Sequence, residues 1–307
     1  MGRGVKLLIL LAAFFVLTGS LVILAALPHL VTGTVINRHV DFEVVYHPRE
    51  WGLEVKPLSL LTDDGYELAA WELEVQEPKA VVIFLGGLEH PPVSAFWGHA
   101  RALAEHGFAS LLIEMRSHGA SAGEQVYLGY MEHYDLLAGI QYIQENLGDV
   151  PLVAFGADLG GVVAINGAGL YSELDGVISI GAFSSWPDLF RDNLYFSGTP
   201  LLVAMLEKPF VQLYTLVKFG WKNRGLYPQQ QAANLAGRPA LLMHSTDDPL
   251  VSVLNLERIT LSLGPGAKVE TWFREGDEHL VAKDFLYPEN DSEYLQRVLG
   301  WLKNNFN

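Results

Sequence analysis

The chain has 307 residues, of which 50% are hydrophobic, and a formal net charge of -15 at pH 7. This acidic excess argues against non-specific binding to nucleic acid and against docking on anionic lipid through charge alone. There is no cysteine, so a disulfide framework, a thiol nucleophile and a thiolate metal site are all excluded.

An uncharged apolar stretch over residues 7–27 is the first predicted element. About 20 apolar residues cross a bilayer as a helix, whereas a cleavable signal peptide has an apolar core of only about 7–15, so we predict a transmembrane anchor over residues 1–30. Ala25-Ala26 leaves cleavage open. Arg3 and Lys6 precede the stretch, which predicts a cytoplasmic N-terminus and an extracytoplasmic domain at the cell membrane.

Residues 31–46 are expected to form a connector to a single domain over residues 47–307. The domain begins with two strands, at 55–61 and 67–74, joined by an Asp-Gly turn. Strands then alternate with helices, which predicts an α/β fold with a mostly parallel sheet covered on both faces. The later strands are expected at residues 80–85, 109–113, 152–155, 177–180, 240–244 and 268–273, and the helices at 94–106, 132–147, 160–170, 253–263 and 291–305.

Residues 184–235 interrupt the alternation and are rich in aromatic and aliphatic side chains. An insertion between two core strands lies over the strand ends, where α/β proteins bind ligands. Two interpretations stay open: a lid that shapes an apolar pocket, and a helical excursion that packs its own small core.

The segment Gly156-Ala157-Asp158-Leu159-Gly160-Gly161 has the frame of a nucleophile elbow, G-x-S-x-G-G, with an aspartate at the serine position. In an elbow, glycines on either side of the nucleophile let a strand and a helix crowd together, and the next N–H points into an oxyanion site. The flanking residues predict the required strand and helix. The frame therefore predicts the turn, while Asp158 decides which chemistry the site can perform.

Two further segments extend the pattern. Residues 116–124 read RSHGASAGE, similar to an R-x-H-G-x-S-x-G loop, and residues 239–251 read as a strand followed by an acidic loop. With the elbow, these segments resemble the α/β-hydrolase superfamily over roughly residues 48–302, and most of all its bacterial lysophospholipase-like and small-esterase members. The resemblance implies the α/β-hydrolase fold and a scaffolding role for His118 and Ser121.

The resemblance also implies a triad in the chain order nucleophile, acid, histidine. Carried over by position, it assigns Asp158, Asp248 and His279 as the catalytic residues. Asp247 is the nearest competitor for the acid.

In relatives, two backbone N–H groups form the oxyanion site. They belong here to Leu159, after the nucleophile, and to Leu88, after Gly86-Gly87, which stands where the family has His-Gly. A backbone donor does not need the missing histidine side chain, so the resemblance still implies a complete pair of donors.

The aspartate changes the chemistry that this frame can support. Its donors and the helix N-terminus favour the carboxylate, which cannot usefully attack an ester because the product is an anhydride. A carboxylate can displace a leaving group from sp³ carbon, and His279 can then activate water to hydrolyse the alkyl ester. Haloalkane dehalogenases and epoxide hydrolases in the superfamily are built this way, but Leu159 and Leu88 replace the halide donors. Candidate leaving-group donors of the lid are Tyr195, Tyr214 and Tyr227.

Three hypotheses follow. The first is a membrane-anchored hydrolase acting on a small or apolar substrate; the second is an inactive fold kept as a binding or scaffolding module; the third is a purely structural anchored domain. The histidine spacing predicts no metal site, and no glycine-rich phosphate loop predicts a nucleotide or other cofactor. The sequence leaves the oligomeric state open.

Overall fold

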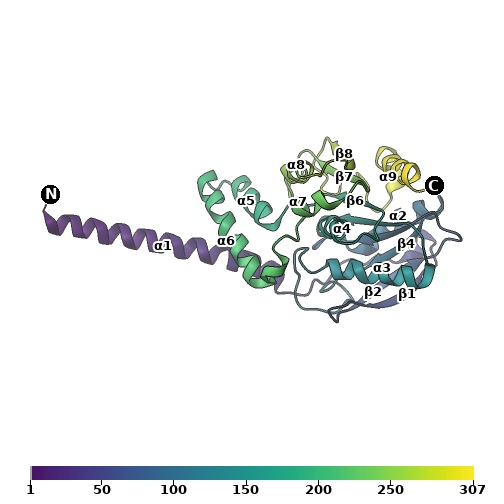
Figure 1. Ribbon diagram of the computed structural model, residues 1–307, viewed down its shortest axis with the longest axis horizontal. Coiled ribbons are helices and arrows are strands. Elements are labelled where there is room, and N and C mark those ends of the chain that lie inside the picture. Colours follow the sequence, from purple (N-terminus) through teal and green to yellow (C-terminus); the bar gives the residue numbers. More distant parts are fainter. Residues whose placement is uncertain (1) are drawn as a thin grey trace.

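The computed structural model describes residues 2–307. Its centre is an eight-stranded sheet in the order β1-β2-β4-β3-β5-β6-β7-β8, in which β1 and β2 pair antiparallel and all strands from β3 onward run parallel (Figure 1). The predicted α/β class with a mostly parallel sheet is confirmed. The strands are β1 (Lys56–Leu61), β2 (Glu67–Leu73), β3 (Val81–Leu85), β4 (Ala109–Ile113), β5 (Leu152–Ala157), β6 (Gly176–Ile180), β7 (Pro239–Ser245) and β8 (Lys268–Arg274).

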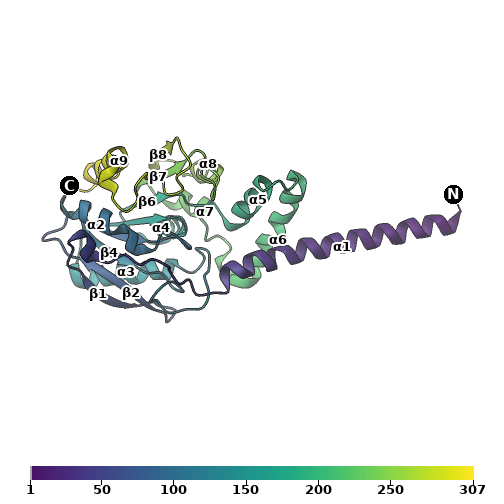
Figure 2. The same cartoon turned by 180° about the vertical axis from the view of Figure 1, so that it is seen from behind.

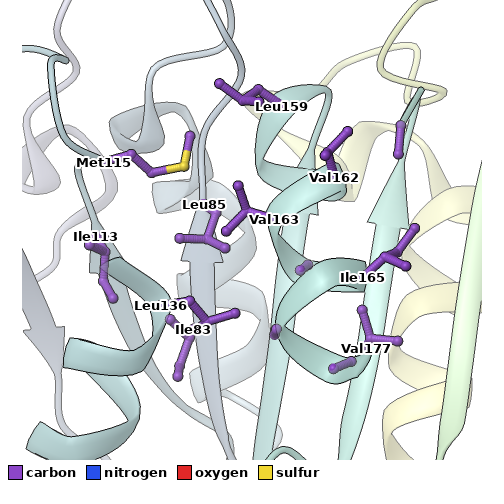
Figure 3. Close-up of a cluster of buried hydrophobic side chains, with 14 of the residues drawn as sticks. Ile83, Leu85, Ile113, Met115, Leu136, Leu159, Val162, Val163, Ile165 and Val177 are labelled. Atoms are coloured by element: carbon purple, nitrogen blue, oxygen red, sulfur yellow. The ribbon is translucent and has the colours of Figure 1, made fainter. Parts of the chain in front are cut away.

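Helices cover both faces of the sheet, as the alternation predicts. Leu85 and its neighbours on one face pack against α3 and α4 through residues such as Leu136 and Val163 (Figure 3). On the other face, Phe84 belongs to a second core that includes Trp97 of α2 and residues of α9. The helices are α1 (Arg3–Ile36), α2 (Trp97–Ala104), α3 (His133–Leu147), α4 (Leu159–Leu170), α5 (Trp186–Phe196), α6 (Leu201–Phe219), α7 (Pro228–Gln231), α8 (Leu254–Leu261) and α9 (Ser292–Asn305).

Helix α1 is longer than the sequence pattern predicts. It continues to Ile36, so residues 31–36, expected in a connector, are helical. They extend the helix because Thr32 and Ile36 find buried positions against the domain. Residues 3–27 carry no such contacts and are almost entirely exposed, and the helix is long and apolar enough to cross a membrane.

The insertion at 184–235 folds into α5, α6 and α7, which stand beside the end of α1 (Figures 1 and 2). The indole Nε1 of Trp186 donates to Thr32 Oγ1 at 3.0 Å, and the ring of Tyr214 packs edge-on against His29 at 5.7 Å. The inserted helices therefore share their core with α1, which neither interpretation of the insertion included.

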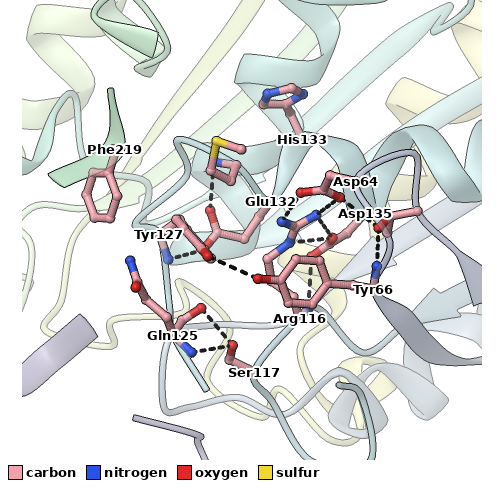
Figure 4. Close-up of polar contacts among 12 residues, drawn as sticks. Asp64, Tyr66, Arg116, Ser117, Gln125, Tyr127, Glu132, His133, Asp135 and Phe219 are labelled. Atoms are coloured by element: carbon pink, nitrogen blue, oxygen red, sulfur yellow. Dashed lines mark hydrogen bonds and ion pairs between the residues drawn. The ribbon is translucent and has the colours of Figure 1, made fainter. Parts of the chain in front are cut away.

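The loop after β4 is held by a buried ion network (Figure 4). Arg116 donates from Nη1 to Asp64 Oδ2 at 2.6 Å and from Nε to Asp135 Oδ1 at 2.8 Å, and its guanidinium lies 4.3 Å from the ring centre of Tyr66. Ser121 Oγ accepts the N–H of Ala69 at 2.9 Å. These contacts give the loop at 116–124 the scaffolding role that the resemblance implies for Ser121.

Candidate active site

The elbow forms at the end of β5, where Asp158 lies between the strand and the first residue of α4. Its backbone has φ 52° and ψ -116°, a strained conformation that L-residues adopt at functional turns. A Cβ at Gly156 would lie 2.0 Å from the carbonyl carbon of Gly160, and one at Gly160 would lie 2.2 Å from Leu85 O. The glycines of the motif are thus required by close backbone approach, as the sequence predicts.

The Asp158 carboxylate has one oxygen in a backbone cradle and one facing a histidine. Oδ2 accepts the N–H of Leu88 at 2.9 Å, and the N–H of Leu159 also stabilises the carboxylate. Oδ1 lies 3.8 Å from Nε2 of His279, beyond hydrogen-bonding distance. The donors expected to form the oxyanion site therefore hold the side chain of Asp158 itself.

His279 lies in the loop after β8 and joins the two acidic groups. Its Nδ1 is 2.7 Å from Asp248 Oδ2, which orients Nε2 toward Asp158. This is the orientation that a triad histidine needs, with one nitrogen held by the acid and the other directed to the nucleophile.

Asp248 is fixed by its own loop after β7. Its Oδ1 accepts the backbone N–H groups of Leu250 at 2.9 Å and of Val251 at 3.0 Å. Asp247, the competing acid, is exposed and accepts a hydrogen bond from its neighbour Thr246. Of the two aspartates, only Asp248 reaches His279.

Comparisons with known proteins identify the fold that carries this site. The family model described as serine aminopeptidase, S33, matches residues 76–224, slightly less than half of the chain, and this match includes Asp158 but ends before Asp248. An esterase of Pyrococcus furiosus has a similar structure, with a TM-score of 0.66, 21% identity and coverage of 88% of this chain and 98% of that chain. The chain has the α/β-hydrolase fold.

Other solved structures share this α/β-hydrolase fold with similar sequence identities. An α/β hydrolase from Penicillium matches with a TM-score of 0.61 and 18% identity, over 83% of this chain and 99% of that chain. The esterase domain of a Rhodothermus marinus protein matches with a TM-score of 0.56 and 20% identity, over 83% and 100%. No curated protein matches the sequence. Together, these structures show the α/β-hydrolase fold, and the family model matches within the part of the chain that forms it.

The site of this α/β hydrolase-fold chain carries two carboxyl groups with opposite pKa shifts. Burial raises the pKa of Asp158, and the charge of His279 and the N–H groups of Leu88 and Leu159 offset this only in part. We expected those donors to favour ionisation, and they do, but desolvation is the larger effect. Burial also opposes ionisation of Asp248, but hydrogen bonds from His244 and His279 hold its pKa well below its usual range.

The histidine responds to both carboxyl groups. Burial lowers the pKa of His279, but the hydrogen bond to Asp248 and the charges of Asp158 and Asp248 outweigh it, so the pKa is raised above 6.5. The imidazolium form is therefore favoured between the two acids. Such perturbed groups gathered at one elbow are typical of functional sites.

Two further histidines support the site from outside. His118 contacts the carbonyl oxygen of Leu88 through Nε2 at 3.0 Å, so it fixes the segment that carries the oxyanion donor. His244 Nε2 lies 2.7 Å from Val251 O and 3.4 Å from Asp248 Oδ2. Sequence reasoning missed His244, although its spacing of four residues from Asp248 in a strand-and-loop segment was a usable signal.

The lid tyrosines do not gather at the nucleophile. Tyr214 contacts His29 of α1, and Tyr195 packs against Phe196. Tyr227 lines a polar cavity formed largely by the insertion at 184–235. Across residues 2–307, none of the three forms a hydrogen bond with Asp158. Over the same residues, no group of three His, Cys, Asp or Glu side chains is arranged to hold a metal ion.

Proposed function

We propose that the protein is a membrane-anchored hydrolase that displaces a leaving group from sp³ carbon, with Asp158 as nucleophile and His279, oriented by Asp248, as general base. The substrate class is a small apolar molecule with an electrophilic saturated carbon. No cofactor takes part in this mechanism.

One observation carries the proposal: the two oxygens of Asp158 lie in two different environments. Oδ2 accepts the N–H of Leu88 at 2.9 Å, while Oδ1 faces His279, with Nε2 at 3.8 Å. Oδ1 is therefore the oxygen available for attack, and Oδ2 already occupies the place where charge develops later.

In the first step, Oδ1 forms a bond to the substrate carbon, the bond from that carbon to the leaving group breaks, and the leaving group departs with its electron pair. The product is an alkyl ester of Asp158 whose carbonyl oxygen is Oδ2. An aspartate can form this ester at carbon that carries a halide or an epoxide oxygen, whereas attack on a carboxylic ester or a peptide yields an anhydride.

In the second step, His279 Nε2 takes a proton from water, and the hydroxide adds to the carbonyl carbon of the ester. The negative charge develops on Oδ2, which the N–H of Leu88 stabilises, and the N–H of Leu159 also favours the charged form of this group. The tetrahedral intermediate then expels the alkoxide, which receives the proton from His279. The products are an alcohol and the carboxylic acid of Asp158, which releases its proton to solvent and returns to the carboxylate.

The test is to trap the ester by removing the base. The full-length His279→Ala variant is incubated with short haloalkanes, aliphatic epoxides and aryl esters, followed by intact mass and peptide mapping. We expect a stable adduct on Asp158 from one of the first two classes, and none in the matched double variant that also carries Asp158→Asn. A variant that keeps its thermal transition but forms no adduct with any of these compounds argues against the proposal.

The alternative is a catalytically inactive fold that serves as a binding or scaffolding module. The position of Asp158 Oδ2 favours this alternative, because this oxygen occupies the place where a substrate oxyanion would bind. None of the tyrosines of residues 184–235 donates a hydrogen bond to it. The Asp158→Ser variant separates the two. Esterase activity in that variant means that the donors, His279 and Asp248 form working machinery, and inertness in both forms favours the binding module.

The membrane part of the proposal rests on α1. Its residues 7–26 are uncharged and almost entirely exposed, and they have no role in the core of the domain. We propose that they anchor the chain in the membrane with the domain on the extracytoplasmic side, and that residues 184–235 form the cap over the site. Membrane fractionation with protease protection of the domain tests this placement.

A further inference from the structure

The turn between α5 and α6 presents an unusually apolar surface to solvent. Residues 193–206 contain no charged side chain, and six large apolar side chains among them are exposed, with Leu202 at 69% and Phe196 at 61%. We call this surface the cap tip, and it consists of Phe196, Leu201, Leu202, Val203, Met205 and Leu206.

The cap tip is not the packed face of its helix. The buried face of α6 is formed by other residues, among them Ala204, Glu207 and Val211. As far as Leu206, the helix is therefore apolar both toward the domain, at Ala204, and away from it. A helix that is apolar all round is typical of a buried or membrane environment, and a contiguous exposed apolar patch marks an interaction surface.

The position of the cap tip indicates what covers it. In both views, α5 and α6 project from the domain on the side from which α1 leaves it (Figures 1 and 2). The last turns of α1 contact α5 and α6, and an apolar groove between Val31 and Val35 of α1 and Leu194 of α5 connects them. The cap tip and the exposed apolar part of α1 therefore lie on the same side of the domain, with this apolar groove between α1 and α5.

Polar contacts appear at the opposite end of α6. Lys218 Nζ donates to Asn37 Oδ1 at 3.0 Å, just beyond the last residue of α1, and Arg38 forms an ion pair with Glu89. Along this part of the molecule, charge is concentrated toward the domain, and the apolar side chains lie toward the free part of α1. This is the division expected at the surface of a bilayer.

We propose that the cap tip inserts into the apolar region of the membrane leaflet that faces the domain. The proposal rests on the anchoring by α1 proposed above. The occupant is the acyl region of lipid and not an anionic headgroup layer, because the cap tip has no cation of its own and the whole chain has a net charge of -15. A second copy of the chain is the competing occupant.

This placement gives the site a route from the lipid phase. A groove that begins at Phe196 of the cap tip is also lined by Asn193 of α5 and by the loop that holds the acid, including Asp247, Asp248 and Pro249, and it leads from the cap tip to this loop. An apolar substrate dissolved in the leaflet therefore meets the cap tip before it meets water. The substrate class becomes a lipophilic compound that partitions into membranes.

The test uses the absence of cysteine, since each introduced cysteine takes up a single fluorophore. An environment-sensitive probe is placed at Leu202→Cys or Met205→Cys in the full-length protein, which is reconstituted into phosphatidylcholine vesicles. Leu17→Cys in α1 is the control for the bilayer interior. Leu147→Cys, at the end of α3 that leads back to the start of β5, is the control for water. Quenchers are lipids with spin labels on their acyl chains, and iodide in the buffer.

We expect the probes at residues 202 and 205 to be quenched by the labelled lipid, as at residue 17, and protected from iodide, which quenches residue 147. If the probe at residue 17 is quenched by lipid while those at 202 and 205 remain accessible to iodide, α1 anchors the chain but the cap tip does not enter the membrane, and the proposal is wrong. If residue 17 also stays in water, the anchor itself fails. Protection of 202 and 205 without lipid quenching, together with a crosslinked dimer, assigns the surface to a second copy and overturns the proposal.

Discussion

Two clusters of carboxyl groups lie near the carboxyl ends of the central strands, and each is organised around one nitrogen base. In the first, Arg116 is completely buried and pairs in a forked manner with Asp64 and directly with Asp135. In the second, His279 contacts Asp248 at 2.7 Å but lies 3.8 Å from Asp158. We call the Arg116 cluster closed, because its base is hydrogen-bonded to both acids, and the His279 cluster open, because its base is hydrogen-bonded to only one.

The difference shows how the same residue types serve structure or chemistry. A guanidinium keeps its charge at any pH the protein meets and satisfies its partners with fixed donors, so the Arg116 cluster holds one loop in place. An imidazole changes charge near neutral pH, and Asp158 is held at a strained backbone position with one oxygen facing His279 across 3.8 Å. The His279 cluster retains the capacity to move a proton.

The largest effect is expected from breaking the closed cluster. Arg116→Met leaves two carboxyl groups without their cation, and loss of one partner of a buried ion pair costs about 3–5 kcal/mol. We expect this loss in the free energy of unfolding of the full-length protein in detergent, measured by urea titration. The matched control is Arg101→Met, which breaks the half-exposed pair with Glu289 and should cost about 0–1 kcal/mol. Equal losses in the two variants would remove the distinction between the clusters.

Removing the carboxyl group of Asp158 from the His279 cluster should raise the free energy of unfolding, in contrast to Arg116→Met. Asp158→Gly removes a buried carboxyl group and places glycine at φ 52°, where it is unstrained. Since a residue in such a conformation costs about 1–3 kcal/mol, we expect the variant to gain about 1–2 kcal/mol in stability and to lose all activity. The same urea titration measures it. A loss of stability comparable to that of Arg116→Met would mean that Asp158 is a structural residue.

A smaller effect concerns the titration of His279. The charges of both acids favour the imidazolium, so its pKa lies above 6.5, and Asp158→Asn should lower that pKa by removing one of the charges. Hydrolysis of the ester requires the neutral imidazole, and Asp158 is uncharged in the ester as in this variant. This step should therefore accelerate as the pH rises through the lowered pKa of His279. Histidine NMR measures the shift, and Asp247→Asn, at an exposed position away from His279, should leave it unchanged. An unchanged pKa in Asp158→Asn would show that the 3.8 Å separation carries no electrostatic coupling.

The sequence was sufficient for the elbow because its requirements are local. Gly156 and Gly160 are needed where backbones approach within a few ångströms, and that need is visible in the spacing alone. The chain order of Asp158, Asp248 and His279 follows from the family frame, and the structure brings the three together. The choice of Asp248 over Asp247 could only be settled by burial, which depends on the whole loop.

Other features depend on contacts between distant segments. The carboxylate of Asp158 occupies its own oxyanion cradle because the loop at Leu88 approaches it, and this contact spans 70 residues. The upward shift of the Asp158 pKa arises from burial by several elements, which no motif encodes. Likewise, α1 continues to Ile36 because the cap offers it a surface, and the cap was expected to pack alone or over the site.

The central claim is that Asp158 becomes a covalent ester that water cleaves at the carboxyl carbon. A single turnover in water enriched in oxygen-18, followed by peptide mapping, tests it most directly with a substrate identified by the His279→Ala trap. The account predicts one heavy oxygen in the carboxylate of Asp158 and none in the alcohol, whose oxygen comes from Oδ1. Label in the alcohol with an unlabelled Asp158 would mean that water attacks the substrate directly, and would contradict the account.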